Sequence, residues 1–188
     1  MIAVAYYTNN TPYVKLVPGF KQSCQKFNIP HKVYGIDSQG NWIKNTQYKA
    51  VFLKDTLNKL KQPILYVDID AKFMGFPELI PQLEQDTSID IAVNYAYRRY
   101  VSGDELASGT IYLPYKDTTN KILDLWIEEN NKTPAGWDQR TLQKVLAGMP
   151  GINIYRLPME YCHIFDDNQY PVDHPIICHF QASRKFRN

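Results

Sequence analysis

Two aspartates separated by one residue, Asp68 and Asp70, directly follow the apolar run at residues 64–67. Two carboxylates at one place repel each other unless a cation lies between them. Oxygen ligands at that density suit a hard divalent ion such as Mg²⁺ or Mn²⁺, and such an ion can neutralise a departing diphosphate. An Asp-x-Asp also occurs as a solvated turn in which one aspartate accepts from a backbone amide. The tripeptide alone therefore leaves two interpretations, a metal site and a simple turn.

Three further positions have a structural as well as a chemical interpretation. Asp138 lies at the expected start of a helix, where an N-cap residue needs no catalytic role. Gly109 is compatible with a bulge or with a close approach of the backbone. His179 lies in an apolar strand, where a hydrogen-bonded structural histidine is common. Its place at the far end of that strand, beside the basic residues 184–187, instead favours exposure near a site.

The cysteines do not predict a metal centre or a disulfide framework. Three are present, Cys24, Cys162 and Cys178, which is an odd and small number. Two of them precede a histidine, but adjacent strand residues point to opposite faces, so a Cys-His dipeptide is a poor zinc chelator. We expect no zinc site, and the cysteine usage indicates a reducing compartment.

An alternation of strands and helices must position these residues. Apolar runs predict strands, helical spacing of apolar residues predicts helices between them, and the continuous run at 64–67 fits a strand buried on both faces of a parallel sheet. In such sheets ligands bind beyond the carboxyl ends of the strands, where Asp68 and Asp70 stand. The expected strands are residues 2–7, 32–36, 64–67, 89–93, 110–113, 154–157 and 176–180, and the expected helices are 12–27, 46–61, 118–129 and 138–147.

Composition limits the class of protein. The chain has 188 residues, 44% of them apolar and 21% charged, with a formal net charge of +2, which suits one globular domain with no required nucleic-acid partner. No apolar run reaches the length of a membrane span, and the polar N-terminus does not resemble a secretory signal. We therefore expect a cytoplasmic protein without an integral membrane segment.

Four short motifs occur in a fixed order along most of the chain: ILYVDID at 64–70, ASGTIYL at 107–113, WDQRTL at 137–142 and ICHFQASRK at 177–185. This ordered set resembles the nucleotide-diphospho-sugar transferases with the glycosyltransferase A-type (GT-A) fold. The resemblance implies an α/β fold, with one GT-A-type, Rossmann-like domain over residues 1–188. Its central sheet would be mostly parallel and flanked by helices, with a smaller mixed C-terminal part. Residues 1–70 would bind the nucleotide, and residues 71–188 would bind the sugar and the acceptor.

The resemblance also implies a role for each matching residue. The metal, Mn²⁺ or Mg²⁺, would be held by Asp68, Asp70 and His179. Asp138 and Gln139 would meet the donor sugar or the acceptor hydroxyl, and Lys185 would hold the diphosphate and stabilise the leaving nucleotide. The remaining donor contacts would come from Tyr6, Tyr7 and Thr8 at the nucleoside, from Lys49, from Asp68 at the ribose, and from Ser108 and Gly109, where the backbone can approach the sugar closely.

The implied reaction moves a sugar from a nucleotide-diphospho-sugar, with UDP-sugar as the expected donor, to an acceptor hydroxyl on a glycan, protein, small molecule or modified DNA. The sequence departs from the family pattern at Ala107, where many relatives have Asn, and at Phe186, where some have Pro. These departures leave donor and acceptor open. An inverting enzyme would use Asp138 as general base, whereas in a retaining enzyme the leaving phosphate would take the proton.

Three alternatives remain. Residues 95–100 interleave tyrosine with arginine, which together with the basic tail would suit a glycosyltransferase acting on DNA bases. By resemblance that segment is a loop facing the acceptor, where Asp104 or Glu105 would act on a hydroxyl. A nucleotidyltransferase would need a Gly-rich basic loop after the first strand, but residues 8–12 read TNNTP. A non-catalytic binding module would not need to keep Asp68, Asp70, Asp138 and His179 together.

Overall fold

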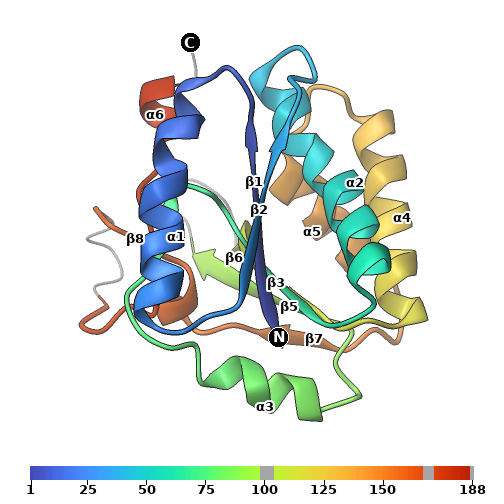
Figure 1. The fold of residues 1–188 in the computed structure, drawn as a ribbon. Coiled ribbons are helices and arrows are strands. Elements are labelled where there is room, and N and C mark those ends of the chain that lie inside the picture. The colour runs from blue at the N-terminus through green and yellow to red at the C-terminus, as the bar shows by residue number, and fades with distance from the viewer. Residues whose placement is uncertain (98–103, 167–171, 187–188) are drawn as a thin grey trace.

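A computed structural model describes residues 1–97, 104–166 and 172–186 (Figure 1). Its main sheet has six strands in the order β2-β1-β3-β6-β5-β7. Within these ranges only β6 runs against the other strands, because β1 pairs in parallel with β2 and β3, β6 pairs antiparallel with β3 and β5, and β5 pairs in parallel with β7. The prediction of a mostly parallel α/β sheet is therefore confirmed. The strands are β1 (Ile2–Thr8), β2 (His31–Ile36), β3 (Ile64–Val67), β5 (Ile91–Tyr97), β6 (Asp104–Leu113) and β7 (Ile154–Arg156).

Helices cover both faces of this sheet (Figure 1). Along β1 the side chains alternate, so Val4 packs in the core with Leu53 and Trp126, whereas Ala3 packs on the opposite face with Phe20. Burial on both faces explains why the strands read as continuous apolar runs. One face carries α2 (Trp42–Leu60), α4 (Asp117–Lys132) and α5 (Asp138–Gly148); the other carries η1 (Pro12–Leu16), α1 (Val17–Lys26), α3 (Leu79–Gln85) and α6 (Ser183–Phe186).

A smaller sheet is built from the second half of the chain. It contains β4 (Ala71–Phe73), β9 (Ile177–His179) and β8 (His163–Ile164), in the order β4-β9-β8, with η2 (Met159–Tyr161) just before β8. β4 pairs antiparallel with β9, and Ala71 stands opposite His179. This register brings His179 next to the turn that carries Asp70. The expected smaller, mixed C-terminal part is present.

Several predicted boundaries were wrong for local reasons. The helix expected at 46–61 already begins at Trp42, because the Asn41 side chain caps it by accepting from the Lys44 N–H at 2.9 Å. The helix expected at 12–27 is divided into the 3₁₀ turn η1 and α1.

The segment expected as an acceptor loop is largely a hairpin. Asp104 and Glu105 lie in β6, paired with residues of β5 up to Tyr97. Arg98, Arg99 and Tyr100 lie outside the described residues. No helix within the described ranges is long and apolar enough to cross a bilayer.

Candidate active site

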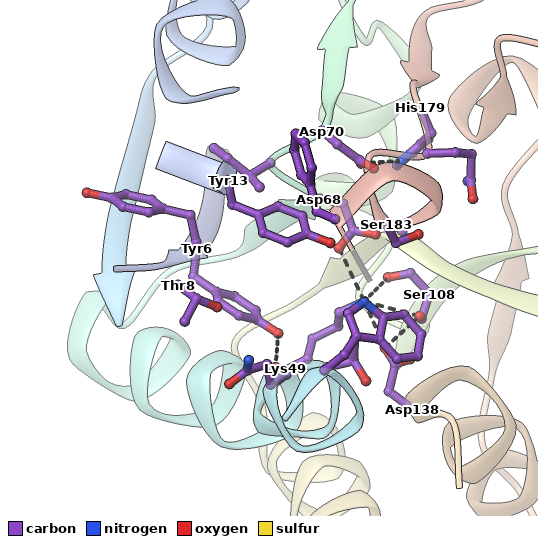
Figure 2. Close-up of a pocket in the computed structure, with 18 of the residues that line it drawn as sticks. Tyr6, Thr8, Tyr13, Lys49, Asp68, Asp70, Ser108, Asp138, His179 and Ser183 are labelled. Carbon is purple, nitrogen blue, oxygen red and sulfur yellow. Dashed lines mark hydrogen bonds and ion pairs between the residues drawn. The ribbon is translucent and has the colours of Figure 1, made fainter. Parts of the chain in front are cut away.

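The ends of β1 and β3, the start of α2 and the start of α5 surround one cavity of about 670 Å³ (Figure 2). A volume of this size accommodates a cofactor-sized ligand. The cavity lies at the carboxyl edge of the parallel strands, where open α/β sheets bind ligands. Every predicted site residue except Lys185 lines it: Tyr6, Tyr7, Thr8, Lys49, Asp68, Asp70, Ser108, Gly109, Asp138, Gln139 and His179.

Asp68, Asp70 and His179 converge at one end of this cavity. One ligand atom from each lies within 4.8 Å of the others. Asp70 is held by its two oxygens: Oδ2 accepts the Ala182 N–H at 2.8 Å, and Oδ1 lies 3.9 Å from His179 Nδ1. The backbone between the two aspartates is also fixed, because the Asp68 N–H donates to the Gly109 carbonyl at 2.9 Å. The turn after β3 and the end of β9 therefore build one cluster.

His179 is oriented from behind by Thr110. The imidazole Nε2 lies 3.0 Å from the Thr110 hydroxyl, which is fully buried. In the tautomer that is protonated at Nε2, the lone pair of Nδ1 faces the two aspartates, which is the orientation of a ligating histidine. The sequence favoured exposure of His179, and that was wrong: the residue is only 3% exposed, because β9 lies between β4 and β8.

Charge in this cluster is shared between the imidazole and the carboxylates. Burial by itself lowers the pKa of His179, but Cys162 and Asp70 outweigh it and raise the pKa to about 10. Burial acts in the opposite sense on Asp70, yet the nearby His179 imidazole and the hydrogen bond from the Ala182 N–H leave the pKa of this carboxyl below its usual value. Without a cation, His179 therefore carries the proton, and a ligating metal must displace it.

Gly109 makes the cluster sterically feasible. A Cβ atom at this position would lie 2.7 Å from His179 Cε1, 3.0 Å from its Nδ1 and 3.2 Å from Asp68 Oδ2. Even an alanine would thus collide with two of the three side chains in the cluster. Both interpretations of Gly109 agree with the structure, because the β5–β6 register also shifts here, with Val93 opposite Ile111 but Asn94 opposite Ala107, so that Gly109 lies in an irregular stretch of β6.

The chemistry of this cluster fits a hard divalent cation. Two carboxylates and one imidazole are oxygen and nitrogen ligands of the kind that Mn²⁺ and Mg²⁺ accept. Ligands on opposite sides of such an ion stand about 4.2 Å apart, given bond lengths of about 2.1 Å. The observed spread of up to 4.8 Å needs only a small contraction to reach that separation.

Lys49 is the central cation of the site (Figure 2). It is 4% exposed, and its Nζ lies 2.8 Å from Asp138 Oδ2, 3.2 Å from Asp68 Oδ1 and 3.1 Å from both the hydroxyl and the carbonyl oxygen of Ser108. Burial alone would lower the pKa of Lys49, but the Asp138 and Asp68 carboxylates reverse this and raise it. Lys49 is therefore charged at neutral pH and joins the cluster of Asp68, Asp70 and His179 to α5.

Asp138 belongs to this network and does not cap its helix. Trp137 occupies the N-cap position of α5, whereas the Asp138 carboxylate accepts from Lys49 and, at 2.9 Å, from the Ser108 hydroxyl. Its backbone carbonyl accepts from the buried Trp126 indole at 3.0 Å. The side chain is held at the cavity wall from both sides, so the capping interpretation of Asp138 was wrong.

At the other side of the cavity, β1 contributes a polar and aromatic wall. Tyr6 and Thr8 are buried apart from the edge that they present to the cavity, and the Tyr6 hydroxyl donates to the Asn45 carbonyl at 2.7 Å. Burial raises the pKa of Tyr6, so this phenol is neutral. A nucleoside placed here would meet rings and hydroxyls, with the charges of Lys49 and Asp138 close enough to act on Tyr6.

Lys185 lies apart from this set. It is an exposed residue of α6 and does not line the cavity, whereas its neighbour Arg184 does, in an ion pair with Asp166. Other lining residues were not among the predicted site residues. Trp42 and Asn45 lie outside the four motifs, whereas Glu105 was named only as a candidate at the acceptor hydroxyl and Trp137 opens the WDQRTL motif without a role of its own.

Comparison of the whole structure finds glycosyltransferases. A glycosyltransferase involved in the glycosylation of the major capsid of PBCV-1 aligns over 100% of this chain and 97% of its own, with a TM-score of 0.70 and 13% identity. Mouse xyloside xylosyltransferase 1 aligns over 97% and 98%, with a TM-score of 0.64 and 12% identity. The glycosyltransferase GlyE of Streptococcus pneumoniae TIGR4 aligns over 95% of this chain and 54% of its own, with a TM-score of 0.66 and 15% identity.

No protein family and no curated protein matches the sequence by itself. The likeness is therefore one of fold, and at this level the expected GT-A-type architecture is confirmed.

Proposed function

We propose that this protein is a divalent-metal-dependent glycosyltransferase that takes its sugar from a nucleotide-diphospho-sugar. One observation carries the proposal: Asp68, Asp70 and His179 converge in a cavity at the carboxyl edge of the sheet, in a fold shared with glycosyltransferases. The fold alone would also suit a binding module. The spacing and the buried second contacts of the three ligands favour chemistry at this place.

In this proposal the first part of the chain, residues 1–70, binds the nucleotide. Tyr6, Tyr7 and Thr8 contact the nucleoside, with a UDP-sugar as the expected donor, and Asp68 contacts the ribose. Ser108 and Gly109 line the floor under the donor sugar, where the missing side chain of glycine leaves room. Lys185 would approach the diphosphate by a movement of α6.

The transfer step balances with the groups present. The oxygen of the acceptor hydroxyl forms a bond to C1 of the donor sugar, and the bond from C1 to the β-phosphate oxygen breaks. The nucleoside diphosphate leaves with that electron pair, and the positive charge of Lys185 would stabilise it once α6 had brought this exposed side chain to the cavity. The hydroxyl proton passes to Asp138 in an inverting reaction or to the departing phosphate in a retaining one. The anomeric configuration of the product distinguishes the two.

Asp68, Asp70 and His179 would hold Mn²⁺ or Mg²⁺, and a bound ion of this kind would supply charge neutralisation for the diphosphate. Other residues of the chain hold these ligands and Asp138 in position. Lys49 holds Asp68 and Asp138 at a fixed separation, and Thr110 and Ala182 orient the two ends of the His179–Asp70 pair. Gln139, next to Asp138 on the cavity wall, would contact the donor sugar or the acceptor hydroxyl.

A thermal-shift titration tests the donor site. UDP, GDP and CDP are each added with and without Mn²⁺, because a ligand that binds only the folded state raises Tm by mass action. We expect a Mn²⁺-dependent rise with one nucleotide, and its loss in Asp70→Asn. Asp124→Asn is the matched control, since Asp124 lies on the exposed side of α4 in an ion pair with Lys54.

Release of the nucleoside diphosphate from the matching sugar nucleotide then tests turnover. A shift without turnover under any acceptor condition would favour a binding module. The absence of a shift with all three nucleotides would contradict the donor-site assignment, and retention of full activity in EDTA would contradict the metal.

A further inference from the structure

Two tryptophans form a corner in the cavity wall, away from the metal cluster. Trp42 is the first residue of α2, and Trp137 directly precedes α5. Their ring centroids lie 6.4 Å apart with the planes at 86° to each other, and both residues line the cavity. We call this pair, with Arg140 and Glu105 beside it, the tryptophan corner.

Exposure of such large rings at a cavity needs an explanation. Trp137 is 37% exposed, whereas Trp126, the remaining tryptophan, is fully buried in the core. An indole offers a flat apolar face with negative charge density and a polar N–H at its edge. A pyranose ring has the complementary surface, with a face of weakly positive C–H groups and hydroxyls around its rim. The corner thus has the chemistry of a saccharide subsite.

Polar groups lie beside Trp137. The Arg140 guanidinium lies over the Trp137 ring, 4.9 Å from its centroid, so it covers part of one indole face, and its Nε lies 3.3 Å from Glu105 Oε1. Gln139 lines the same wall. A guanidinium can donate paired hydrogen bonds to neighbouring hydroxyls of a sugar, a carboxylate can accept them, and an amide can do both.

The charges at the corner match a neutral acceptor better than a polyanion. Arg140 is paired with Glu105, and Arg156, at the end of β7, is paired with Asp104 at 3.0 Å. A nucleic-acid acceptor needs cations that can exchange counterions for phosphates. Around the described part of the corner, carboxylates already occupy these arginines.

The corner is also placed correctly relative to the reacting groups. Trp137 adjoins Asp138, whose carboxylate lies 2.8 Å from Lys49, and Lys49 in turn contacts Asp68 of the metal cluster. A donor bound at the cluster would direct its sugar towards Ser108 and Asp138. A ring stacked in the corner would present a hydroxyl to the same place.

We propose that the tryptophan corner binds a pyranose ring of the acceptor, so that the acceptor is a glycan. The role of this sugar as the acceptor rests on the proposed function, whereas the binding of a saccharide at the corner does not. Trp42 and Trp137 provide the stacking surface, and Arg140 with Glu105 selects the hydroxyl pattern at the rim. This choice among glycan, protein, small molecule and DNA acceptors is open to a direct binding test.

The test uses the indole N–H signals of the ¹⁵N-labelled full chain, of which there are three. Methyl glycosides of glucose, galactose, mannose and xylose are titrated without nucleotide. We expect at least one to shift the Trp42 and Trp137 signals with a Kd on the order of 1 mM. The signal of buried Trp126 reports whether the fold is intact. Affinity should fall roughly tenfold in Trp137→Ala and partly recover in Trp137→Phe.

Tyr115→Ala is the matched control, because Tyr115 is 42% exposed but does not line the cavity. Equal affinity of Trp137→Ala and the unaltered chain, or no shift with any glycoside up to about 100 mM, would overturn the proposal. Salt-sensitive shifts with a DNA duplex and none with glycosides would overturn it in favour of nucleic acid. The Mn²⁺-dependent nucleotide shift reports the donor site separately, so saccharide binding without nucleotide binding would retain the subsite and reject the proposed transfer.

Discussion

Substitution of Gly109 by alanine is the most direct perturbation of the candidate metal site formed by Asp68, Asp70 and His179. The new Cβ would stand 2.7 Å from His179 Cε1 and 3.2 Å from Asp68 Oδ2. Carbon atoms in contact are normally about 3.5–4.0 Å apart, so the imidazole must retreat by roughly 1 Å. Metal ligands tolerate displacements of only about 0.2 Å. We therefore expect Gly109→Ala to weaken Mn²⁺ binding by at least about tenfold, as loss of ligand positioning does elsewhere.

The same substitution also reports on packing. His179 is 3% exposed and is bonded to Thr110, so its retreat strains a dense region. Overpacking of this kind costs about 1–3 kcal/mol of the free energy of unfolding. Isothermal titration with Mn²⁺ measures the first effect, and urea denaturation in EDTA measures the second.

Gly148→Ala is the control for Gly109→Ala. Gly148 is the last residue of α5, and a Cβ there meets nothing within 4 Å. Alanine is preferred to glycine in helices, so this variant should bind Mn²⁺ normally and be at least as stable. Unchanged Mn²⁺ affinity in Gly109→Ala would refute the assignment of His179 and Asp68 as ligands of one ion.

Two further substitutions test the network that supports the site, and a third tests an ion pair outside it. Lys49→Met leaves the Asp138 carboxylate buried without its cation and should lower the free energy of unfolding by about 3 kcal/mol in urea titrations, against a loss near zero if the pair is dispensable. Thr110→Val removes the hydroxyl that contacts His179 Nε2. The affinity for Mn²⁺, measured by calorimetry, should fall about 10-fold or more, with little change in Tm. Equal Mn²⁺ affinity of the variant and the unaltered protein would show that the hydroxyl does not orient the ring. Asp90 accepts from Lys116 at 2.8 Å and from the Asn153 N–H at 2.7 Å, and although burial by itself raises the pKa of Asp90, these contacts lower it. A lowered folded pKa stabilises the protein above the unfolded value of about 3.9, and this contribution is lost as pH falls through the folded pKa. Asp90→Asn should therefore cost about 1–3 kcal/mol at pH 7 and progressively less below pH ~4, and a pH-independent difference would contradict this origin.

The central sheet was predictable because its strands are buried on both faces. The four residues of β3 are all buried, and such a run has few other solutions in a chain of alternating strands and helices. The site residues of the ordered motifs, except Lys185, also came together, although Asp70 and His179 are distant in sequence. The spacing of these two residues along the chain does not predict that they lie close together. That prediction came from the resemblance, and the pairing of β4 with β9 is its structural cause.

What the sequence could not predict depends on side-chain direction. Arg184 and Lys185 are adjacent and equally basic, and only the docking of α6 turns the first towards the cavity. Lys49 was expected to contact the sugar-nucleotide donor, but it is buried between two carboxylates and holds Asp68 and Asp138 in position. The tryptophan corner joins α2 to the start of α5, and no short motif spans those two elements.

The pairing of Ala71 with His179 has a consequence for how the protein assembles. Side chains alternate along a strand, so a slip of one residue between β4 and β9 would turn the imidazole to the opposite face and leave the aspartates without it. This contact joins distant parts of the chain, and contacts of that kind form late because their loop entropy must be overcome first. The larger sheet can therefore consolidate before the ligand set is complete. A bound ion would stabilise the smaller sheet against local opening, and it should therefore slow hydrogen exchange of the backbone amides of β9 more than that of β1.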